Sequence, residues 1–404
     1  MSNIKNDAKA GNNGKIKSLF KLATQGNAKA QYKLGERYYC GKGVKKNYRE
    51  AVKWFRKAAD QGCAEAQLGL GVCCNLGKGL EENLAEAATW YRRAAERGVS
   101  LAQFFLGLAY ATGDGVEQNF SEAATWYRRA ADQGYVDAQF LVGVYYAEGR
   151  GVEQDDAKAV EWYTKAAKQG HLEAQCYLAT CYLDGRGVKQ NLKEAAKWWR
   201  KSAEQHHAPA QYNLGICYAT GEGLKQNYRE AVKWFRKAAK QGFAQAQYEL
   251  GMCYCYGEGV KQDYREAVKW FRPAAEQGDV SAQVKLAAFY FDGTGVSKNY
   301  AEATKLYRKA AEQGLPAAQY TLGFCYYTGI GVKKNYAEAV KWFRKAAKQG
   351  HALALYNLGR CYELGRGIKQ DKAKGSKWRS KGIAQLKVLI KSGKQNRVRE
   401  FVKD

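Results

Sequence analysis

Four acidic residues have the spacing of a binding surface on paired helices. Two of them stand eleven residues apart, and the same pair recurs 36 residues later. Eleven residues make about three helical turns, which brings both carboxylates of a pair back to nearly the same helix face. Because an apolar residue lies within each pair, the pattern predicts four carboxylates around an apolar centre, a surface that suits a partner with Lys or Arg beside an apolar anchor. The residues of this predicted site are Asp137, Leu141 and Glu148, followed by Glu173, Tyr177 and Asp184.

Catalytic motifs are incomplete in this sequence. Two Ser-x-x-Lys strings, Ser2–Lys5 and Ser18–Lys21, have the spacing of a serine nucleophile and its lysine base, but neither Ser-Asp-Asn nor Lys-Thr-Gly occurs in the chain. The glycine-rich segment Gly71–Lys78 has one residue too many for a phosphate-binding loop and is not followed by Ser or Thr. We therefore predict a protein without a catalytic residue and without a cofactor.

Histidine offers the remaining candidates for metal binding. Three of the four histidines, His171, His207 and His351, are separated by multiples of 36 residues, and we expect them in exposed loops without a metal ion. The fourth, His206, replaces a glycine that ends the equivalent segment elsewhere.

The 11 cysteines include no Cys-x-x-Cys pair, and six of them share one position of a 36-residue repeat. Equivalent helices of neighbouring repeats lie about 8–10 Å apart, whereas a disulfide needs Cα atoms within about 7 Å. We therefore expect shielded, free thiols, which favour a reducing compartment. The six are Cys73, Cys181, Cys217, Cys253, Cys325 and Cys361.

A 36-residue repeat runs through the chain without insertion. Alanine recurs at ten successive positions from Ala30 to Ala354, and Tyr38 and Trp54 each recur with a single exception. Such self-similarity is typical of a solenoid, in which each unit buries its apolar face against its neighbours.

Each repeat contains two segments with helical periodicity, here called the A helix and the B helix. The A helix of the first repeat covers residues 28–40 and is followed by Gly41, which supplies a left-handed C-cap. The B helix follows Asn47, a position that is Asn or Asp in all ten repeats, with Glu three residues later in eight of them. This is the spacing of an N-cap and capping box. In the seventh B helix Pro273 predicts a local kink, because it removes an interior hydrogen bond.

The predicted fold class is all-α, an α/α superhelical solenoid of about ten 36-residue helix-turn-helix repeats. We expect a disordered tail over residues 1–14 and the repeats over 15–382, which begin with a capping helix at 15–26 and continue as ten units from about residue 27. Residues 383–404 carry apolar residues at helical spacing and a basic end, and we expect a C-terminal capping helix there.

The repeated pattern A-Q-x-x-L-G-x-x-Y-x-x-G-x-G-V, then N-Y-x-E-A-x-x-W-F-x-K-A-A-x-Q-G, resembles the Sel-1-like repeats, a branch of the tetratricopeptide superfamily. The resemblance covers about nine-tenths of the chain. It implies a role as adaptor or scaffold in protein complexes and no shared catalytic residue. Cysteine-rich secreted relatives have been linked to β-lactamase activity, but the regular cysteine pairs and signal peptides of those relatives are missing here.

Charge leaves a second function open. The chain carries 66 Lys and Arg against 39 Asp and Glu, a net charge of +27 that lies mainly outside the A helices. An evenly basic exterior favours a solvated surface, and the alternative is a solenoid that binds nucleic acid or an anionic surface. The acids of the predicted site likewise have a simpler alternative role, which is to hydrate a groove or to pair with lysines of neighbouring loops.

Because no apolar run suggests a signal peptide or a membrane span, we expect a cytoplasmic protein, with signal-independent secretion left open.

Overall fold

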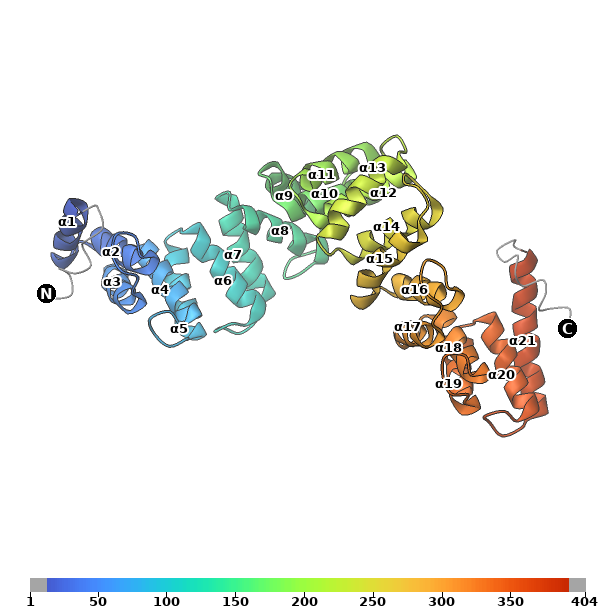
Figure 1. The fold of residues 1–404 in the computed structure, drawn as a ribbon. Helices are drawn as coiled ribbons and strands as arrows, with labels where there is room; N and C mark the ends of the chain where they lie inside the picture. The colour runs from blue at the N-terminus through green and yellow to red at the C-terminus, as the bar shows by residue number, and fades with distance from the viewer. Residues whose placement is uncertain (1–12, 392–404) are drawn as a thin grey trace. The chain divides into compact units, whose positions relative to one another are not determined.

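The computed structural model describes residues 13–391, with side chains placed for residues 16–388, and every regular element in this range is an α-helix (Figure 1). The helices are α1 (Asn13–Thr24), α2 (Ala28–Cys40), α3 (Tyr48–Asp60), α4 (Ala64–Leu76), α5 (Leu84–Glu96), α6 (Ser100–Thr112), α7 (Phe120–Asp132), α8 (Val136–Glu148), α9 (Asp156–Lys168), α10 (Leu172–Asp184), α11 (Leu192–Glu204), α12 (Ala208–Thr220), α13 (Tyr228–Lys240), α14 (Ala244–Tyr256), α15 (Tyr264–Glu276), α16 (Val280–Asp292), α17 (Tyr300–Glu312), α18 (Pro316–Thr328), α19 (Tyr336–Lys348), α20 (Ala352–Leu364) and α21 (Lys372–Lys391).

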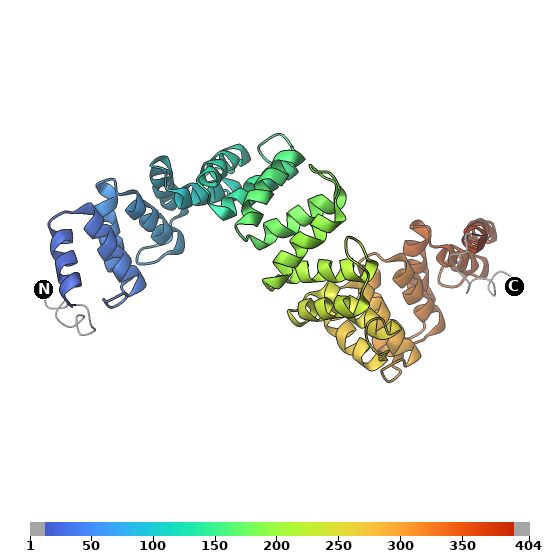
Figure 2. The same cartoon turned by 90° about the horizontal axis from the view of Figure 1, so that it is seen from above.

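The chain forms two compact units, an N-terminal unit over residues 1–202 and a C-terminal unit over residues 203–404. Within each unit the even-numbered A helices alternate with the odd-numbered B helices, and successive helices pack side by side (Figures 1 and 2). The predicted fold of repeated helix-turn-helix units in a solenoid is confirmed.

Asparagine and aspartate begin the B helices as predicted. The Asn47 side chain accepts a hydrogen bond from the Glu50 backbone N–H at 3.1 Å. The second half of the predicted capping box is wrong, because the Asn47 N–H donates instead to the Tyr38 carbonyl at 2.9 Å. Glu50 then turns to Lys53, with 2.7 Å between the two charged groups.

Two glycine positions set how closely the elements approach. A Cβ atom on Gly35 would lie 2.6 Å from the Phe55 ring, so glycine here lets the A and B helices of one repeat pack closely. In the loop after α6, a Cβ atom on Gly115 would lie 2.1 Å from the Leu84 carbonyl oxygen. The loop therefore packs directly on the first turn of the preceding B helix, and Val116 contacts the core.

Buried glutamines join the repeats, a feature that the sequence analysis did not predict. Gln103, on α6, donates to the Ala95 carbonyl at 3.1 Å and accepts from the Gln133 side chain at 2.7 Å. The same side-chain bridge, at 2.7 to 3.0 Å, links seven pairs of glutamines thirty residues apart. Each bridge ties the start of one A helix to the end of the B helix that follows it.

All 11 cysteines are free, as predicted, and nine of them are buried. Burial raises the pKa of the Cys73 thiol to about 12, so this side chain stays protonated and serves as a small apolar residue.

The ends of the described chain differ in part from the predicted boundaries. Helix α1 covers most of the predicted N-terminal capping segment and packs against α2. At the other end, α21 joins the tenth B helix and the segment from residue 383 into one helix, in which Leu386 is buried. The capping role stays a prediction, and residues 1–12 and 392–404 lie outside the described residues.

Candidate partner-binding surface

The first turns of α8 and α10 bring two of the predicted acids together around a histidine. Asp137 and Glu173 each belong to the first turn of their helix, and His171 precedes α10. The His171 Nε2 atom lies 3.5 Å from the Asp137 carboxylate, and its Nδ1 atom lies 3.5 Å from the Glu173 carboxylate. Both carboxylates are more than half exposed, so they remain open to a partner.

The expectation of exposed loop histidines is wrong for His171. Its side chain is only 13% exposed because the ring stacks on Phe140 at 4.7 Å between ring centres. Its Nδ1 atom accepts a hydrogen bond from the Ala174 N–H at 3.2 Å, which caps α10. His171 occupies the N-cap position of its A helix. The same position recurs every 36 residues, so the repeat spacing in the sequence could have identified His171 as a cap.

An aromatic cluster forms the centre of the surface. Tyr177 is 49% exposed and meets Phe140 edge-to-face at 5.4 Å between ring centres, which places α8 beside α10. Beneath it lies the buried ring of Tyr163, 5.5 Å from Tyr177. Leu141, the other predicted apolar residue, is half-buried against the core. Sequence analysis missed Phe140, although it lies one turn from Asp137 on the same helix.

The other two predicted acids are neutralised by their own loops. Glu148 lies 2.5 Å from the Arg150 guanidinium, and Asp184 lies 3.1 Å from Arg186. They stand at the far ends of α8 and α10, about 16 Å along the helix from the first turn. The four predicted carboxylates therefore fall into two groups. Asp137 and Glu173 lie beside His171 and are exposed, whereas Glu148 and Asp184 form ion pairs with arginines of the loops. The partners are arginines of the acids' own loops rather than the lysines of neighbouring loops that the alternative role named.

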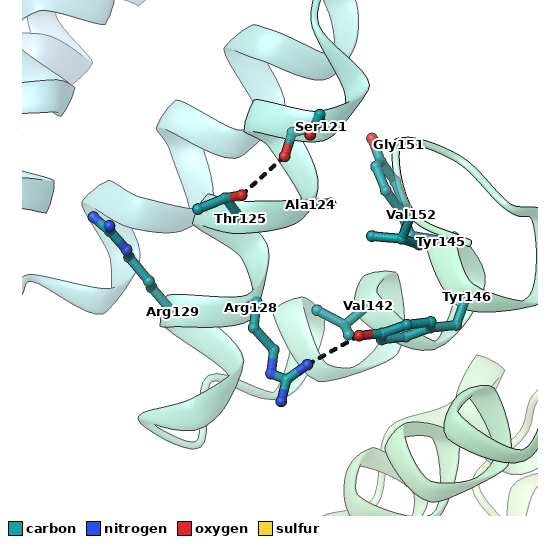
Figure 3. A pocket seen from close by; sticks show the side chains of 10 residues that line it. All are labelled: Ser121, Ala124, Thr125, Arg128, Arg129, Val142, Tyr145, Tyr146, Gly151 and Val152. Carbon is teal, nitrogen blue, oxygen red and sulfur yellow. Dashed lines mark hydrogen bonds between the residues drawn. The ribbon is translucent and has the colours of Figure 1, made fainter. Parts of the chain in front are cut away.

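A pocket of about 320 Å³ lies between α7, α8 and the loop after α8 (Figure 3). Arg128 donates to the Tyr146 hydroxyl at 3.1 Å, and the Thr125 hydroxyl donates to the Ser121 carbonyl at 3.0 Å. These polar groups of the pocket are therefore already bonded within the protein.

The comparisons with known proteins decide the family. The Sel1 repeat profile matches ten consecutive segments, over residues 28–63, 64–99, 100–135, 136–171, 172–207, 208–243, 244–279, 280–315, 316–351 and 352–385. The chain belongs to the Sel1 repeat family. Sel1 repeat and tetratricopeptide-like proteins generally mediate protein–protein interactions.

Two solved Sel1 structures support this assignment. A protective antigen present in uropathogenic Escherichia coli strains, described as displaying an SLR fold, is 34% identical, with a TM-score of 0.68 over 92% of this chain and 90% of that chain. A Sel1 repeat protein from Oxalobacter formigenes is 36% identical, with a TM-score of 0.63 over 76% of this chain and 89% of that one. A comparison with curated proteins gave no match. None of the helices between residues 13 and 391 is both long enough and apolar enough to cross a membrane.

Proposed function

We propose that this Sel1 repeat protein is a non-enzymatic scaffold that holds a partner peptide on the A-helix face of α8 and α10. The observation that carries the proposal is the open carboxylate pair of Asp137 and Glu173, set beside the exposed ring of Tyr177. The chain as a whole has a net charge of +27, so this surface differs in sign from most of the molecule. The free thiols support a cytoplasmic setting for the interaction.

The partner chemistry follows from these groups. A lysine or arginine of the partner would approach the exposed sides of the two carboxylates beside His171, and an adjacent apolar side chain would pack on Tyr177 and Phe140. Charge complementarity of this kind steers association and selects the partner, while the basic exterior discourages docking elsewhere.

The test compares two double variants with the same change in charge on the same two helices. Asp137→Asn with Glu173→Gln removes the open pair, and Glu148→Gln with Asp184→Asn removes the pair already neutralised by arginine. We expect the first variant to bind a partner recovered by affinity purification about 1–2 kcal/mol more weakly, and the second to stay within about 0.5 kcal/mol of the parent protein. Equal affinities of the two variants would move the site away from α8 and α10.

The second candidate function is nucleic-acid binding, which the charge excess of the chain favours. Affinity purification is therefore run with and without nuclease. A partner that is lost on nuclease treatment, but kept by the Asp137→Asn, Glu173→Gln variant, would support the nucleic-acid alternative over the peptide scaffold.

A further inference from the structure

One acceptor of the glutamine bridges has no donor and lies beside a pocket. Gln67, on α4, is only 3% exposed. Its Nε2 atom donates to the Ala59 carbonyl at 3.2 Å, whereas its Oε1 atom is buried and accepts no hydrogen bond from a described residue. A buried oxygen without a donor is rare in folded proteins and costly, so a donor from outside the chain is favourable at this position.

A single residue at the end of α5 explains the missing donor. In seven repeats a glutamine thirty residues after the acceptor donates to it at 2.7 to 3.0 Å. The residue thirty positions after Gln67 is Arg97. The guanidinium of Arg97 lies against the turn before α4, where a Cβ atom on Gly62 would be 3.0 Å from the Nη2 atom. The bridge is therefore broken between these two repeats, and the exposed arginine stands at its edge.

A pocket of about 680 Å³ lies at this break, between the ends of α3 and α5 and the first turns of α4. Gln67 and Arg97 both line the pocket, one as an acceptor and the other as a donor. The charged lining residues are Asp60, Arg93, Glu96 and Arg97, whose formal charges cancel. A neutral pocket with an acceptor beside a donor favours a neutral ligand group that both donates and accepts hydrogen bonds.

We propose that this pocket binds a primary carboxamide, the group at the end of a glutamine or asparagine side chain. The carboxamide N–H donates to the Gln67 Oε1 atom, as the bridge glutamine does elsewhere, and its carbonyl oxygen accepts from the Arg97 guanidinium. In the intact bridges the acceptor is reached from the position that Arg97 occupies here. A ligand that displaces the exposed arginine from Gly62 therefore follows the same path to the oxygen.

Other ligand groups fit these two residues less well. A carboxylate has no hydrogen to donate to the Gln67 oxygen, and an ammonium group has no acceptor for Arg97. The carboxamide site lies at helix ends in the first repeats, away from α8 and α10. The proposed function and this inference can therefore fail independently of each other.

The experiment uses saturation-transfer difference NMR on the full chain with two glutamine compounds. Free L-glutamine represents an amino acid as the source of the carboxamide, and N-acetyl-L-glutamine N-methylamide represents a side chain within a peptide. The compound that binds more tightly identifies the source. L-glutamate, in which a carboxylate replaces the carboxamide, is the control ligand and is expected to bind at least about tenfold more weakly than L-glutamine.

Two variants at one position separate the roles of Gln67 and Arg97. Arg97→Gln supplies the missing donor from the chain itself and is expected to abolish measurable binding of both compounds. Arg97→Ala removes more of the side chain but leaves the oxygen open, and it is expected to weaken binding by less than about fivefold, because an exposed hydrogen bond contributes little. The matched loss of charge, Arg229→Gln at an exposed position on α13, is expected to change binding by less than about twofold.

Binding that is lost in Arg97→Gln and kept in Arg97→Ala supports the carboxamide site. Urea unfolding of the same samples separates this result from misfolding, since Arg97→Gln is expected to be at least as stable as the parent protein. Equal loss of binding in the two variants overturns the role of Gln67 and leaves the arginine charge as the attraction. Glutamate that binds as tightly as glutamine overturns the site as well. A lack of binding by both glutamine compounds also overturns it and leaves a water molecule as the donor to the Gln67 oxygen.

Discussion

One buried glutamine lacks the partner that its equivalents have. Gln67 donates to the Ala59 carbonyl at 3.2 Å, but its Oε1 atom is buried and makes no hydrogen bond with any described residue. In the repeats where the bridge forms, a glutamine thirty residues later supplies the donor, and here that position is Arg97. The guanidinium of Arg97 lies against Gly62 instead. A buried acceptor without a donor costs more than a hydrogen bond gains.

Arg97→Gln is expected to complete the bridge and to raise the free energy of unfolding by about 1 kcal/mol. Urea unfolding, together with hydrogen exchange in α4, measures the effect. The reverse change, Gln133→Arg, is the matched control, because it leaves the Gln103 acceptor unpaired and is expected to destabilise by a similar amount. A stabilising Gln133→Arg would contradict the role given to the bridge.

His351 makes the cap of α20 sensitive to pH. Its Nδ1 atom accepts from the Ala354 N–H at 3.3 Å, and its ring stacks on Tyr320 at 4.9 Å between centres. Burial lowers the pKa of His351. Because the folded-state pKa is below the unfolded value of about 6.5, the contribution of the neutral ring is complete above that value and is lost as the pH falls toward the folded pKa.

His351→Asn is expected to keep the cap and to remove this dependence, as Asn27 caps α2 with a bond of 2.9 Å to the Ala30 N–H. The wild-type chain should lose about 1 kcal/mol more than the variant between pH 7.5 and pH 5. Chemical unfolding at the two pH values gives the difference. Parallel pH profiles would show that the histidine titrates without affecting the cap.

At the scale of elements, regular spacing determines what could be predicted. Helix pairs, caps and free thiols follow from residues repeated at 36, such as Asn47 and Gly41, whose effects are local. The capping box failed because the Asn47 N–H is taken by Tyr38, a contact that no local spacing reveals. At the candidate site, sequence placed Asp137 and Glu173 correctly on neighbouring helices but missed His171 between them. That side chain was assigned to a loop, and only packing on Phe140 shows that it is shielded.

Helix α15 keeps its tryptophan but lacks the cation that lies over that tryptophan in most other repeats. In seven repeats a lysine or arginine lies over the tryptophan three residues before it, with 3.7 to 4.7 Å to the ring centre. Pro273 takes that place beside Trp270, and it also lacks the N–H that would bond to the Lys269 carbonyl. The helix runs through Pro273 without ending, and the predicted kink stays a prediction.

Two substitutions separate these effects. Pro273→Ala restores the backbone hydrogen bond, and we expect it to stabilise the C-terminal unit by up to about 3 kcal/mol. Pro273→Lys also restores the cation over Trp270 and is expected to add about 0.5–1 kcal/mol more. Thermal unfolding of both variants gives the two contributions. If Lys and Ala give the same stability, the contacts between cations and tryptophans in the other repeats contribute little.

The charge of the whole molecule separates the two function hypotheses. A chain with a net charge of +27 is expected to repel a basic peptide at long range, while the proposed site at Asp137 and Glu173 would attract it at short range. Salt with a Debye length of about 10 Å at 0.1 M screens both effects, and they oppose each other.

Raising the salt concentration from 50 to 200 mM is therefore expected to change the affinity for a basic peptide, such as the lysine peptide Leu-Lys-Leu-Lys-Leu, by less than about tenfold. Binding of single-stranded nucleic acid along the basic exterior would instead fall by about 300-fold or more if six phosphates or more are contacted, because each neutralised phosphate releases counterions. Titrations of the lysine peptide and of a 20-nucleotide single strand over this range, with the same protein preparation, test the prediction. A steep salt dependence for the cellular partner, matching that of the single strand, would assign the basic exterior rather than the A-helix face as the functional surface. Alternatively, the affinity for the partner could depend only weakly on salt in the parent protein and more strongly once Asp137 and Glu173 are neutralised. That result would show that these carboxylates offset the repulsion of the whole chain at short range.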